Sequence, residues 1–314
     1  MIAFGPVPSR RLGRSLGINN IPPKICTYSC VYCQVGKKGR MQVERGPFYE
    51  AGEIFNRVKN QVKRAGETGE SIDYLTFVSD GEPTLDSNLG REIDQLKTLG
   101  IKIAVITNGS LLNRDDVRAD LVKADWVSLK FDSIWKPDWR RINRPHSGLK
   151  LELILEGMLD FSKIFPGVLV TETMLVHGDS GDMEMRKAMA DFLFGLKPAK
   201  VYLAIPTRPP AEAWVRPPLP EDINNTFQLF RRKLDQVEYL IGYEGNAFAF
   251  TGRVEEDLLS ITSVHPMRST AVSEFLTKAA ADWSVVDRLI AQNKLVETEF
   301  EGQKFYLRNF IRWR

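Results

Sequence analysis

Short apolar runs rich in branched residues alternate with longer amphipathic segments between residues 14 and 207. The apolar runs occupy residues 14–21, 72–79, 101–108, 125–132, 167–176 and 200–207. Between them, apolar residues recur at three- and four-residue intervals within residues 51–66, 87–100, 115–124, 149–165 and 184–197. Strands that alternate with helices in this way predict repeated βα units and a parallel sheet, either an open doubly wound sheet or a barrel.

A different pattern follows the repeating units. The proline-rich run at 208–220 predicts a stiff connector. The connector is followed by an expected helix (221–237) and an extended segment (239–252). Three short helices are expected next, at residues 255–266, 269–281 and 282–295, with Asp282 as the N-cap of the third. The last expected elements are two alternating strands (296–309) joined by a turn at Glu301-Gly302. Three helices followed by a hairpin predict a winged-helix-like domain.

Composition places the chain among ordinary globular proteins. With 314 residues, 43% of them hydrophobic, it is long enough to bury one large core and a smaller one. Charged residues break the longest apolar runs well short of the ~20 residues that span a bilayer. The first residues, MIAFGPVPSRRLGRS, contain prolines and arginines where a signal peptide needs an apolar core. We therefore expect a cytoplasmic protein without a membrane segment.

Positive charge is concentrated near the amino terminus. Residues 1–45 hold eight basic residues against Glu44, a net +7, so the overall +3 leaves −4 for the rest. The basic residues are Arg10, Arg11, Arg14, Lys24, Lys37, Lys38, Arg40 and Arg45. A solvated surface with ion pairs explains two or three such charges. Eight beside one cluster of cysteines indicate an anionic ligand or a polyanionic substrate.

All three cysteines of the chain, Cys26, Cys30 and Cys33, lie in the segment that follows the first predicted strand. Three thiols this close in a cytosolic protein are typical of a metal site rather than a disulfide framework. Soft thiolates suit zinc or an iron–sulfur cluster. Structural zinc normally has a fourth protein ligand, and the three histidines show no matching spacing. A cubane cluster on three cysteines leaves one iron open for another ligand.

The spacing Cys26-x3-Cys30-x2-Cys33, with aromatic Tyr32 before the last cysteine, resembles the motif of the radical S-adenosylmethionine (SAM) superfamily. This resemblance implies one [4Fe-4S] cluster on the three cysteines, with SAM bound to the open iron. It also implies reductive cleavage of SAM to a 5′-deoxyadenosyl radical, which abstracts hydrogen from a substrate. The implied fold is a partial (βα)6 TIM-type barrel.

Further motifs fit the same resemblance. Asp80-Gly81-Glu82-Pro83 is similar to the glycine-glycine-glutamate-proline element that accepts hydrogen bonds from the methionine amino group, with Asp80 in place of the first glycine. The resemblance also implies cofactor or substrate contacts for Tyr32, Asn108, Ser128, Lys130, Asp132 and Arg208. Ser128, Lys130 and Asp132 alternate along one strand and so share a face, as do Thr171 and Thr173 on the next. No side chain is assigned a catalytic proton or nucleophile role.

The resemblance also predicts the domain boundaries and a subgroup within the superfamily. We expect a basic amino-terminal segment (1–20), the radical SAM barrel (14–215), a connecting helix and strand (216–250) and the winged-helix-like domain (251–314). The segments 5–34, 80–85 and 202–218 resemble iron–sulfur oxidoreductases related to tRNA wyosine-base synthases. A fourth cysteine for a second cluster is missing from the sequence, so an external one-electron donor is expected.

Three hypotheses for the function follow. The first is modification of an RNA base, indicated by the basic amino-terminal segment. The second is modification or activation of a peptide or protein. The third is a non-catalytic iron–sulfur redox-sensing regulator. Residues 253–314 carry nine basic and nine acidic residues, whereas a duplex-binding module normally has a basic face. We therefore expect this domain to contact protein or to cap the barrel. Arg10, Arg11 and Arg14 are either an anion clamp or surface ion pairs.

Overall fold

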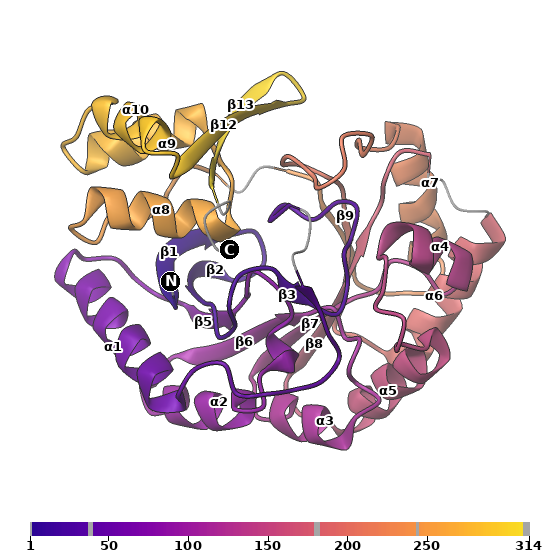
Figure 1. Cartoon of the computed structure of the whole chain (residues 1–314). Helices are drawn as coiled ribbons and strands as arrows, with labels where there is room; N and C mark the ends of the chain where they lie inside the picture. Colours follow the sequence, from indigo (N-terminus) through magenta and orange to yellow (C-terminus); the bar gives the residue numbers. More distant parts are fainter. Residues whose placement is uncertain (1, 37–39, 179–182, 243–244, 310–314) are drawn as a thin grey trace.

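A mostly parallel eight-stranded sheet forms the centre of the protein. The computed structural model describes residues 2–36, 40–178, 183–242 and 245–309. The strands are β1 (Ala3–Ser9), β2 (Gly13–Ile18), β5 (Tyr74–Phe77), β6 (Lys102–Thr107), β7 (Trp126–Lys130), β8 (Val168–Met174), β9 (Lys200–Ala204) and β10 (Val237–Leu240). They lie in the order β1-β2-β5-β6-β7-β8-β9-β10, with β1 antiparallel to β2 and the others parallel. The sheet curves into an open barrel (Figure 1).

Helices cover the outer face of this sheet (Figure 1). They are α1 (Ala51–Glu67), α2 (Leu89–Lys97), α3 (Asp115–Leu121), α5 (Leu151–Ile164), α6 (Met183–Leu196) and α7 (Pro220–Arg231). Their apolar faces pack on the outward residues of the strands, such as Val127 and Leu129 of β7. A short α4 (Lys136–Ile142) packs instead against the loop that carries the cysteines, and a 3-10 turn, η1 (Pro83–Leu85), follows β5. A smaller inner cluster includes Trp126 and Val170. The two faces of each strand are therefore both buried, as expected for a parallel sheet.

The α/β partial-barrel prediction is confirmed, and each of the six expected strands is present. Two further strands lie at the edges. The strand β1 was not predicted, because Pro6 and Pro8 interrupt the apolar residues and proline normally argues against a strand. Proline is tolerated in β1 because an edge strand makes fewer hydrogen bonds to neighbouring strands. Among the described residues of the expected extended segment, 239–242 and 245–252, the first two are in a strand, at the end of β10, and the others are not. The helix α4 was not predicted.

The carboxyl-terminal region has the elements α8 (Val254–Val264), β11 (Met267–Arg268), α9 (Ser269–Lys278), α10 (Ser284–Ala291), β12 (Leu295–Phe300) and β13 (Gln303–Arg308). The three expected helices and the hairpin are thus present. Glu301 and Gly302 both have positive φ angles, 48° and 68°, as the tight turn requires. Asp282 accepts a hydrogen bond from the Ser284 backbone N–H at 2.8 Å. The assignment of these elements to a winged-helix-like domain and the domain boundaries both stay predictions.

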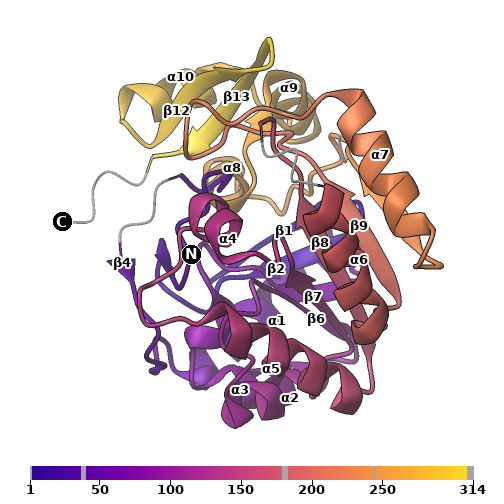
Figure 2. The ribbon, with the colours of Figure 1, turned by 90° about the vertical axis from the view of Figure 1, so that its right-hand side faces the viewer.

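The carboxyl-terminal region packs on the edge strand β1 (Figure 2). Phe4 and Val7 of β1 share a core with Phe248 and with residues of α8, α9 and α10. The Ala249 N–H donates to the Pro6 carbonyl at 3.0 Å, and the Ser260 hydroxyl to the Ala3 carbonyl at 3.4 Å. The outer edge of the sheet is therefore covered by a helix and a loop instead of another strand.

In the described part of the chain, no helix is long and apolar enough to cross a membrane. Four of the basic residues discussed above, Lys37, Lys38, Arg312 and Arg314, lie outside the described residues.

Candidate active site

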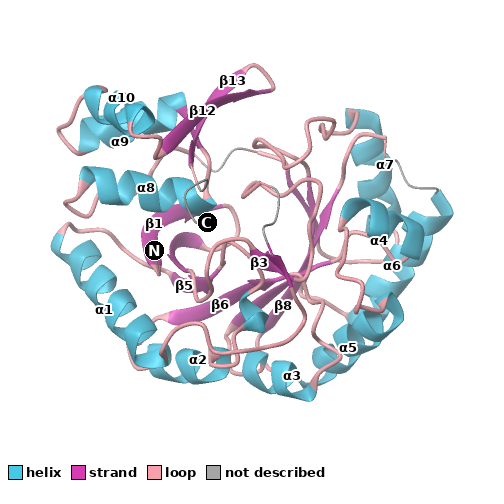
Figure 3. Cartoon of the chain, in the orientation of Figure 1, coloured by secondary structure: helices cyan, strands magenta, loops and turns pink. Residues whose placement is uncertain are grey.

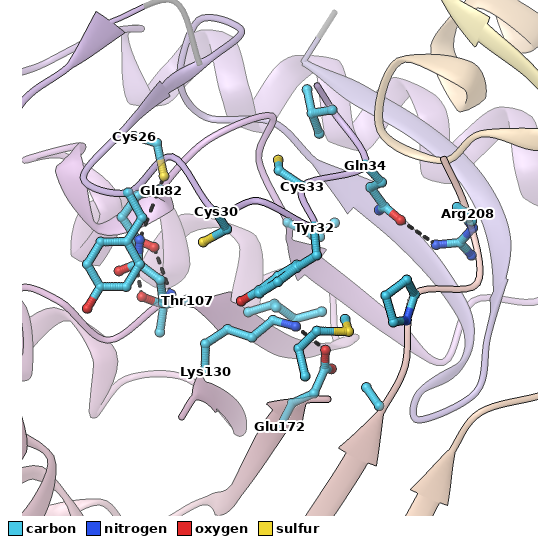
Figure 4. A pocket seen from close by; sticks show the side chains of 18 of the residues that line it. Cys26, Cys30, Tyr32, Cys33, Gln34, Glu82, Thr107, Lys130, Glu172 and Arg208 are labelled. Carbon is cyan, nitrogen blue, oxygen red and sulfur yellow. Dashed lines mark hydrogen bonds and ion pairs between the residues drawn. The ribbon is translucent and has the colours of Figure 1, made fainter. Parts of the chain in front are cut away.

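A cavity of about 260 Å³ lies inside the open barrel. Its walls come from the cysteine loop, from the segments that follow β5, β6 and β9, and from inward-facing residues of β7 and β8. These are loops that leave the carboxyl ends of the strands (Figure 3), where ligands bind in folds of this class. The three cysteines lie at one end of the cavity, and Lys130, Glu172 and Arg208 lie farther from them (Figure 4).

The cysteine loop places three thiols, none of them in a disulfide, on the wall of this cavity. Cys26 ends β3 (Ile25–Cys26), which pairs with β4 (Arg40–Met41). Two side-chain amides point at the sulfurs: Asn108 Nδ2 lies 3.7 Å from Cys26 Sγ, and Asn143 Nδ2 lies 3.5 Å from Cys30 Sγ. Burial and the charge of Asp132 raise the pKa of Cys30 to about 12. Such a thiol stays protonated until a metal replaces the proton.

The described residues hold no ready-made group of three cysteine, histidine or carboxylate side chains that could bind a metal ion. The three thiols all line the same cavity.

Gly81 lets the loop after β5 approach the cysteine loop. A Cβ atom on Gly81 would lie 1.7 Å from the Ile25 carbonyl oxygen, far inside van der Waals contact. The next residue, Glu82, donates its own N–H to the same oxygen at 3.1 Å. Only glycine allows this approach, so the two loops that line this end of the cavity are held together by backbone contact.

The Glu82 carboxylate holds neighbouring loops in place. It accepts hydrogen bonds from the Thr84 N–H and hydroxyl at 3.1 and 2.6 Å, from the Thr107 hydroxyl at 2.5 Å and from the Asn108 N–H at 2.8 Å. Burial raises its pKa, although these hydrogen bonds oppose the shift. Glu82 lines the cavity, as expected, but both of its carboxylate oxygens already accept hydrogen bonds from other residues of the protein. It is a positioning residue for Asn108, which also lines the cavity.

The Asp80 side chain does not line the cavity, so the backbone role expected for Asp80 stays a prediction. Its carboxylate accepts from Asn19 Nδ2 at 2.9 Å, and its N–H donates to Asn19 Oδ1 at 3.0 Å. This reciprocal pair joins the loop after β5 to the end of β2. It gives a physical reason for an aspartate where the related motif has glycine.

The three polar residues of the β7 region have separate positions. Lys130 lines the cavity and pairs with Glu172. Ser128 is buried deeper, with its hydroxyl 3.5 Å from Arg11 Nη1. Asp132 lies beyond the cavity wall and accepts from the Met174 N–H at 2.9 Å and from Asn143 Nδ2 at 2.6 Å. Neither Ser128 nor Asp132 reaches the cavity, so direct cofactor contact is not supported for either.

Tyr32 lines the cavity next to Cys33, as expected. Its hydroxyl donates to the Asp132 carboxylate, and Lys130 Nζ lies over its ring, 5.6 Å from the centroid. Burial raises the pKa of Asp132, even though Lys130 and these hydrogen bonds lower it. Asp132 therefore acts through Tyr32 and fixes the orientation of its ring.

Glu172 is the functional candidate that sequence reasoning missed. Its carboxylate lies in the cavity and pairs with Arg11 and Lys130, which hold its pKa at about 2 in spite of burial. Thr171 and Thr173 share one face of β8, as expected, and it is the face opposite to Glu172, so neither lines the cavity. One signal was present: Lys130 and Glu172 are opposite charges within two buried strands, and they pair directly in the parallel register.

The amino-terminal arginines divide into two groups. Arg10 and Arg11 line the cavity. Arg14 instead forms a partly buried ion pair with Glu70 outside the cavity, so the ion-pair explanation holds for it. Arg208 lines the cavity, as expected, and donates to Gln34 Oε1 at 2.7 Å, with His265 Nε2 3.0 Å from its other nitrogen.

The family model of the radical SAM superfamily matches residues 20–193. The chain belongs to the radical SAM superfamily. Membership confirms the resemblance and makes the protein an enzyme, which removes support for the non-catalytic regulator. It also implies an iron–sulfur cluster and SAM as cofactors.

We compare this radical SAM protein with three proteins that are similar to it. It is 46% identical over 310 residues to the UPF0026 protein MJ1312 of Methanocaldococcus jannaschii, covering 98% of this chain and 96% of that protein. It is 29% identical over 140 residues to a probable GTP 3′,8-cyclase of Methanococcus maripaludis, covering 44% and 42%. The structure of TYW1 with a lysine-pyruvate adduct matches with a TM-score of 0.52 at 16% identity, covering 70% and 74%. This structural match shows a shared fold.

Proposed function

We propose that this radical SAM enzyme holds one [4Fe-4S] cluster on Cys26, Cys30 and Cys33 and modifies a base in RNA. The donor set fits the cluster. Three soft thiols line one cavity, and amide N–H groups from Asn108 and Asn143 point at two of them. When bound, the cluster and SAM supply a 5′-deoxyadenosyl radical that takes hydrogen from the substrate.

The residues of the chain position these reactants. Gly81 allows the loop after β5 to line the cavity beside the cysteines, and Glu82 fixes Asn108. We assign SAM contacts to this loop, to Asn108 and to Tyr32, whose ring is oriented by Asp132. Asp80 supports the loop through its backbone and Asn19. The remaining wall, with Lys130 and Glu172, is left to the substrate.

The charge of the cavity supports an anionic substrate. Four cationic side chains, Arg10, Arg11, Lys130 and Arg208, line it against the two carboxylates Glu82 and Glu172. The similar probable GTP 3′,8-cyclase is named for a nucleotide reaction. A nucleotide unit, with a base to modify and a phosphate to neutralise this charge, satisfies both observations. An external donor in the cytoplasm supplies the electron.

The test is anaerobic reconstitution with iron and sulfide. We expect a brown, oxygen-sensitive protein that converts SAM to 5′-deoxyadenosine when a reductant is added. Cys30→Ala should lose both the cluster absorbance and the cleavage, because a cubane needs all three thiolates here. Ser29→Ala is the matched control, since it changes the neighbouring residue of the same loop and keeps every thiol. Cleavage that survives in Cys30→Ala contradicts the proposal.

The RNA substrate is tested with the same preparation. We expect bound RNA whose affinity falls steeply as salt rises, because contacts to phosphate release counterions. Salt-insensitive binding to a protein partner instead supports modification of a peptide or protein.

A further inference from the structure

A buried side-chain amide, that of Asn143, lies between the Cys30 thiol and a buried carboxylate. Asn143 directly follows α4, and its Nδ2 atom lies 3.5 Å from Cys30 Sγ and 2.6 Å from Asp132 Oδ2. The Tyr32 hydroxyl oxygen is 3.4 Å from the same nitrogen. Only 2% of Asn143 and 8% of Asp132 is exposed. An amide nitrogen carries two hydrogens, so one N–H donates to the carboxylate and the other is left for the sulfur side.

The main chain holds Asn143 in register with the cysteine loop. The Asn143 carbonyl accepts from the Ser29 N–H at 3.0 Å. The preceding carbonyl, that of Ile142, accepts from the Val31 N–H at 2.9 Å. The last carbonyl groups of a helix have no partner within that helix, and here the cysteine loop supplies two donors. The position of the amide relative to Cys30 is therefore fixed by backbone contacts on both sides of this cysteine.

The hydrogen bonds around Asp132 favour its ionised form. Its Oδ1 atom accepts from the Met174 N–H at 2.9 Å. Its Oδ2 atom accepts from the amide of Asn143 and from the Tyr32 hydroxyl. Three donors directed at one carboxylate stabilise its charged form. Burial raises the pKa of Cys30 most, and the charge of Asp132 raises it next. The field of this carboxylate therefore reaches the sulfur.

The two side chains act on a bound cluster in opposite directions. Reduction adds one negative charge to a group that three thiolates already make negative. The net charge near an iron–sulfur cluster and the hydrogen bonds to its sulfurs set its reduction potential. A hydrogen bond from Asn143 to the Cys30 thiolate stabilises the added charge. The carboxylate of Asp132, buried near the same sulfur, opposes the added charge.

We propose that Asn143 and Asp132 set the reduction potential of the cluster through Cys30, with Asn143 raising it and Asp132 lowering it. This inference rests on the proposed function, because it needs the cluster on the three cysteines. One electron from the external donor enters the cluster and passes to the SAM sulfonium, whose carbon–sulfur bond breaks to give methionine and the 5′-deoxyadenosyl radical. Neither side chain lines the cavity, so the pair acts on the transfer of this electron without touching SAM.

The experiment measures the midpoint potential of the cluster in the reconstituted protein without SAM. The measurement is a redox titration followed by electron paramagnetic resonance of the reduced cluster. Asn143→Leu keeps the size of the side chain and removes both N–H donors. We expect it to make reduction about 3- to 10-fold less favourable, a part of the value of one hydrogen bond to a charged group. A tenfold change is about 59 mV for a one-electron couple.

Asp132→Asn should act in the opposite direction and raise the potential. Removal of a full charge near Cys30 outweighs any shift of the neighbouring amide, and should favour reduction about 10- to 100-fold. This opposite sign keeps the inference testable if Asn143→Leu fails to fold or to load iron, which circular dichroism and iron analysis report. Loosened packing alone does not predict opposite shifts in the two variants.

Asn88→Leu is the matched control. Asn88 directly precedes α2, is half-buried and donates from its amide to the Tyr49 carbonyl at 3.0 Å. It does not line the cavity. The variant therefore removes a side-chain amide at the end of another helix, and we expect its cluster to have the potential of the unmodified protein.

Three results overturn the inference. One is a cluster-loaded Asn143→Leu protein with an unchanged potential. Another is an Asp132→Asn protein whose potential is unchanged or lower. The third is a shift in Asn88→Leu as large as that in Asn143→Leu, which assigns the effect to loosened packing. All three leave the proposed radical chemistry intact, whereas an unmodified protein that binds no cluster or does not cleave SAM refutes the proposed function itself.

Discussion

Buried carboxylates near the cavity differ in charge because their neighbours differ. Glu172 faces two cations, which lower its pKa to about 2. Glu92, on α2, is buried beside Asp86, and burial together with the charge of Asp86 raises its pKa. Asn20 Nδ2 lies 3.4 Å from Glu92 Oε2. Glu92 is therefore protonated in the folded chain at pH values at which an exposed glutamate is ionised.

This difference predicts a pH dependence of stability. Because the folded pKa of Glu92 is raised, its contribution is fully present below about pH 4.5, the ordinary value, and is lost as the pH rises through the folded pKa. Glu92→Gln should gain relative stability by roughly 1.4 kcal/mol per pH unit across that window. Urea unfolding of the cluster-free chain at pH 5, 7 and 9 measures the effect.

The control for this experiment is Glu156→Gln, which changes an exposed glutamate of α5. Its difference from the unmodified chain should stay constant over the same pH range. A Glu92→Gln difference that is also constant contradicts the assignment of the proton.

At the scale of elements, the sequence predicts the strands better than the direction of their side chains. The spacing of apolar residues was enough for six strands, because both faces of each are buried and the runs are continuous. On β8, burial of both faces meant that the sequence could not show which residues point into the barrel. Thr171, Glu172 and Thr173 are all buried, so polarity alone could not show that Glu172 points inward. The decisive information is the pairing with Lys130 and Arg11, which only the tertiary structure supplies.

In the candidate active site, too, the sequence predicts which residues come together better than it predicts how their side chains are oriented. The three cysteines were predicted from their spacing, since a short loop must bring them close. The orientation of Asp80 depends on Asn19, more than 60 residues away along the chain. The position of the Arg10 side chain depends on its hydrogen bond to the Leu240 carbonyl, 230 residues later in the chain. Contacts of this length leave no local pattern.

The close approach of two loops at Gly81 predicts a sharp effect of one methyl group. Gly81→Ala forces the Ile25 carbonyl to move, because the new Cβ would lie 1.7 Å from its oxygen. We expect a loss of about 1–3 kcal/mol in unfolding free energy and less iron per chain after reconstitution. Both are measured directly, by urea unfolding and by iron analysis.

Gly66→Ala in α1 is the matched control, since no atom outside its own helix lies within 4 Å of the added Cβ. It should keep its iron and gain up to about 1 kcal/mol, because alanine restricts the unfolded chain. Full iron content in Gly81→Ala contradicts the importance of this approach.

At the scale of the whole molecule, the carboxyl-terminal region is joined to the cysteine loop. Gln34, directly after Cys33, donates from Nε2 to the Val264 carbonyl at the end of α8 at 2.9 Å. Arg208 links the same glutamine to His265, and His265 packs edge-on against Phe248. Movement of the carboxyl-terminal region therefore reaches the cluster site through one side chain.

Phe248→Ala should loosen this connection. Truncating a fully buried phenylalanine typically costs about 3–5 kcal/mol. We expect faster hydrogen exchange both in α8 and in the cysteine loop, with α3 and α5 unchanged. Phe194→Ala is the matched control, because Phe194 is 61% exposed on α6 and should change neither. Faster exchange confined to α8 contradicts the coupling.

The helix that covers β1 also has a consequence for synthesis on the ribosome. The strand, residues 3–9, is synthesised long before its cover, α8, which begins at residue 254. At 5–20 residues per second, roughly 10 to 50 s separate the two. During that time α8 cannot cover the edge of β1, with Phe4 and Val7, and the Val264 carbonyl that accepts the Gln34 hydrogen bond beside Cys33 has not yet been made. The cysteine loop is therefore expected to reach its final conformation only after α8 has been synthesised.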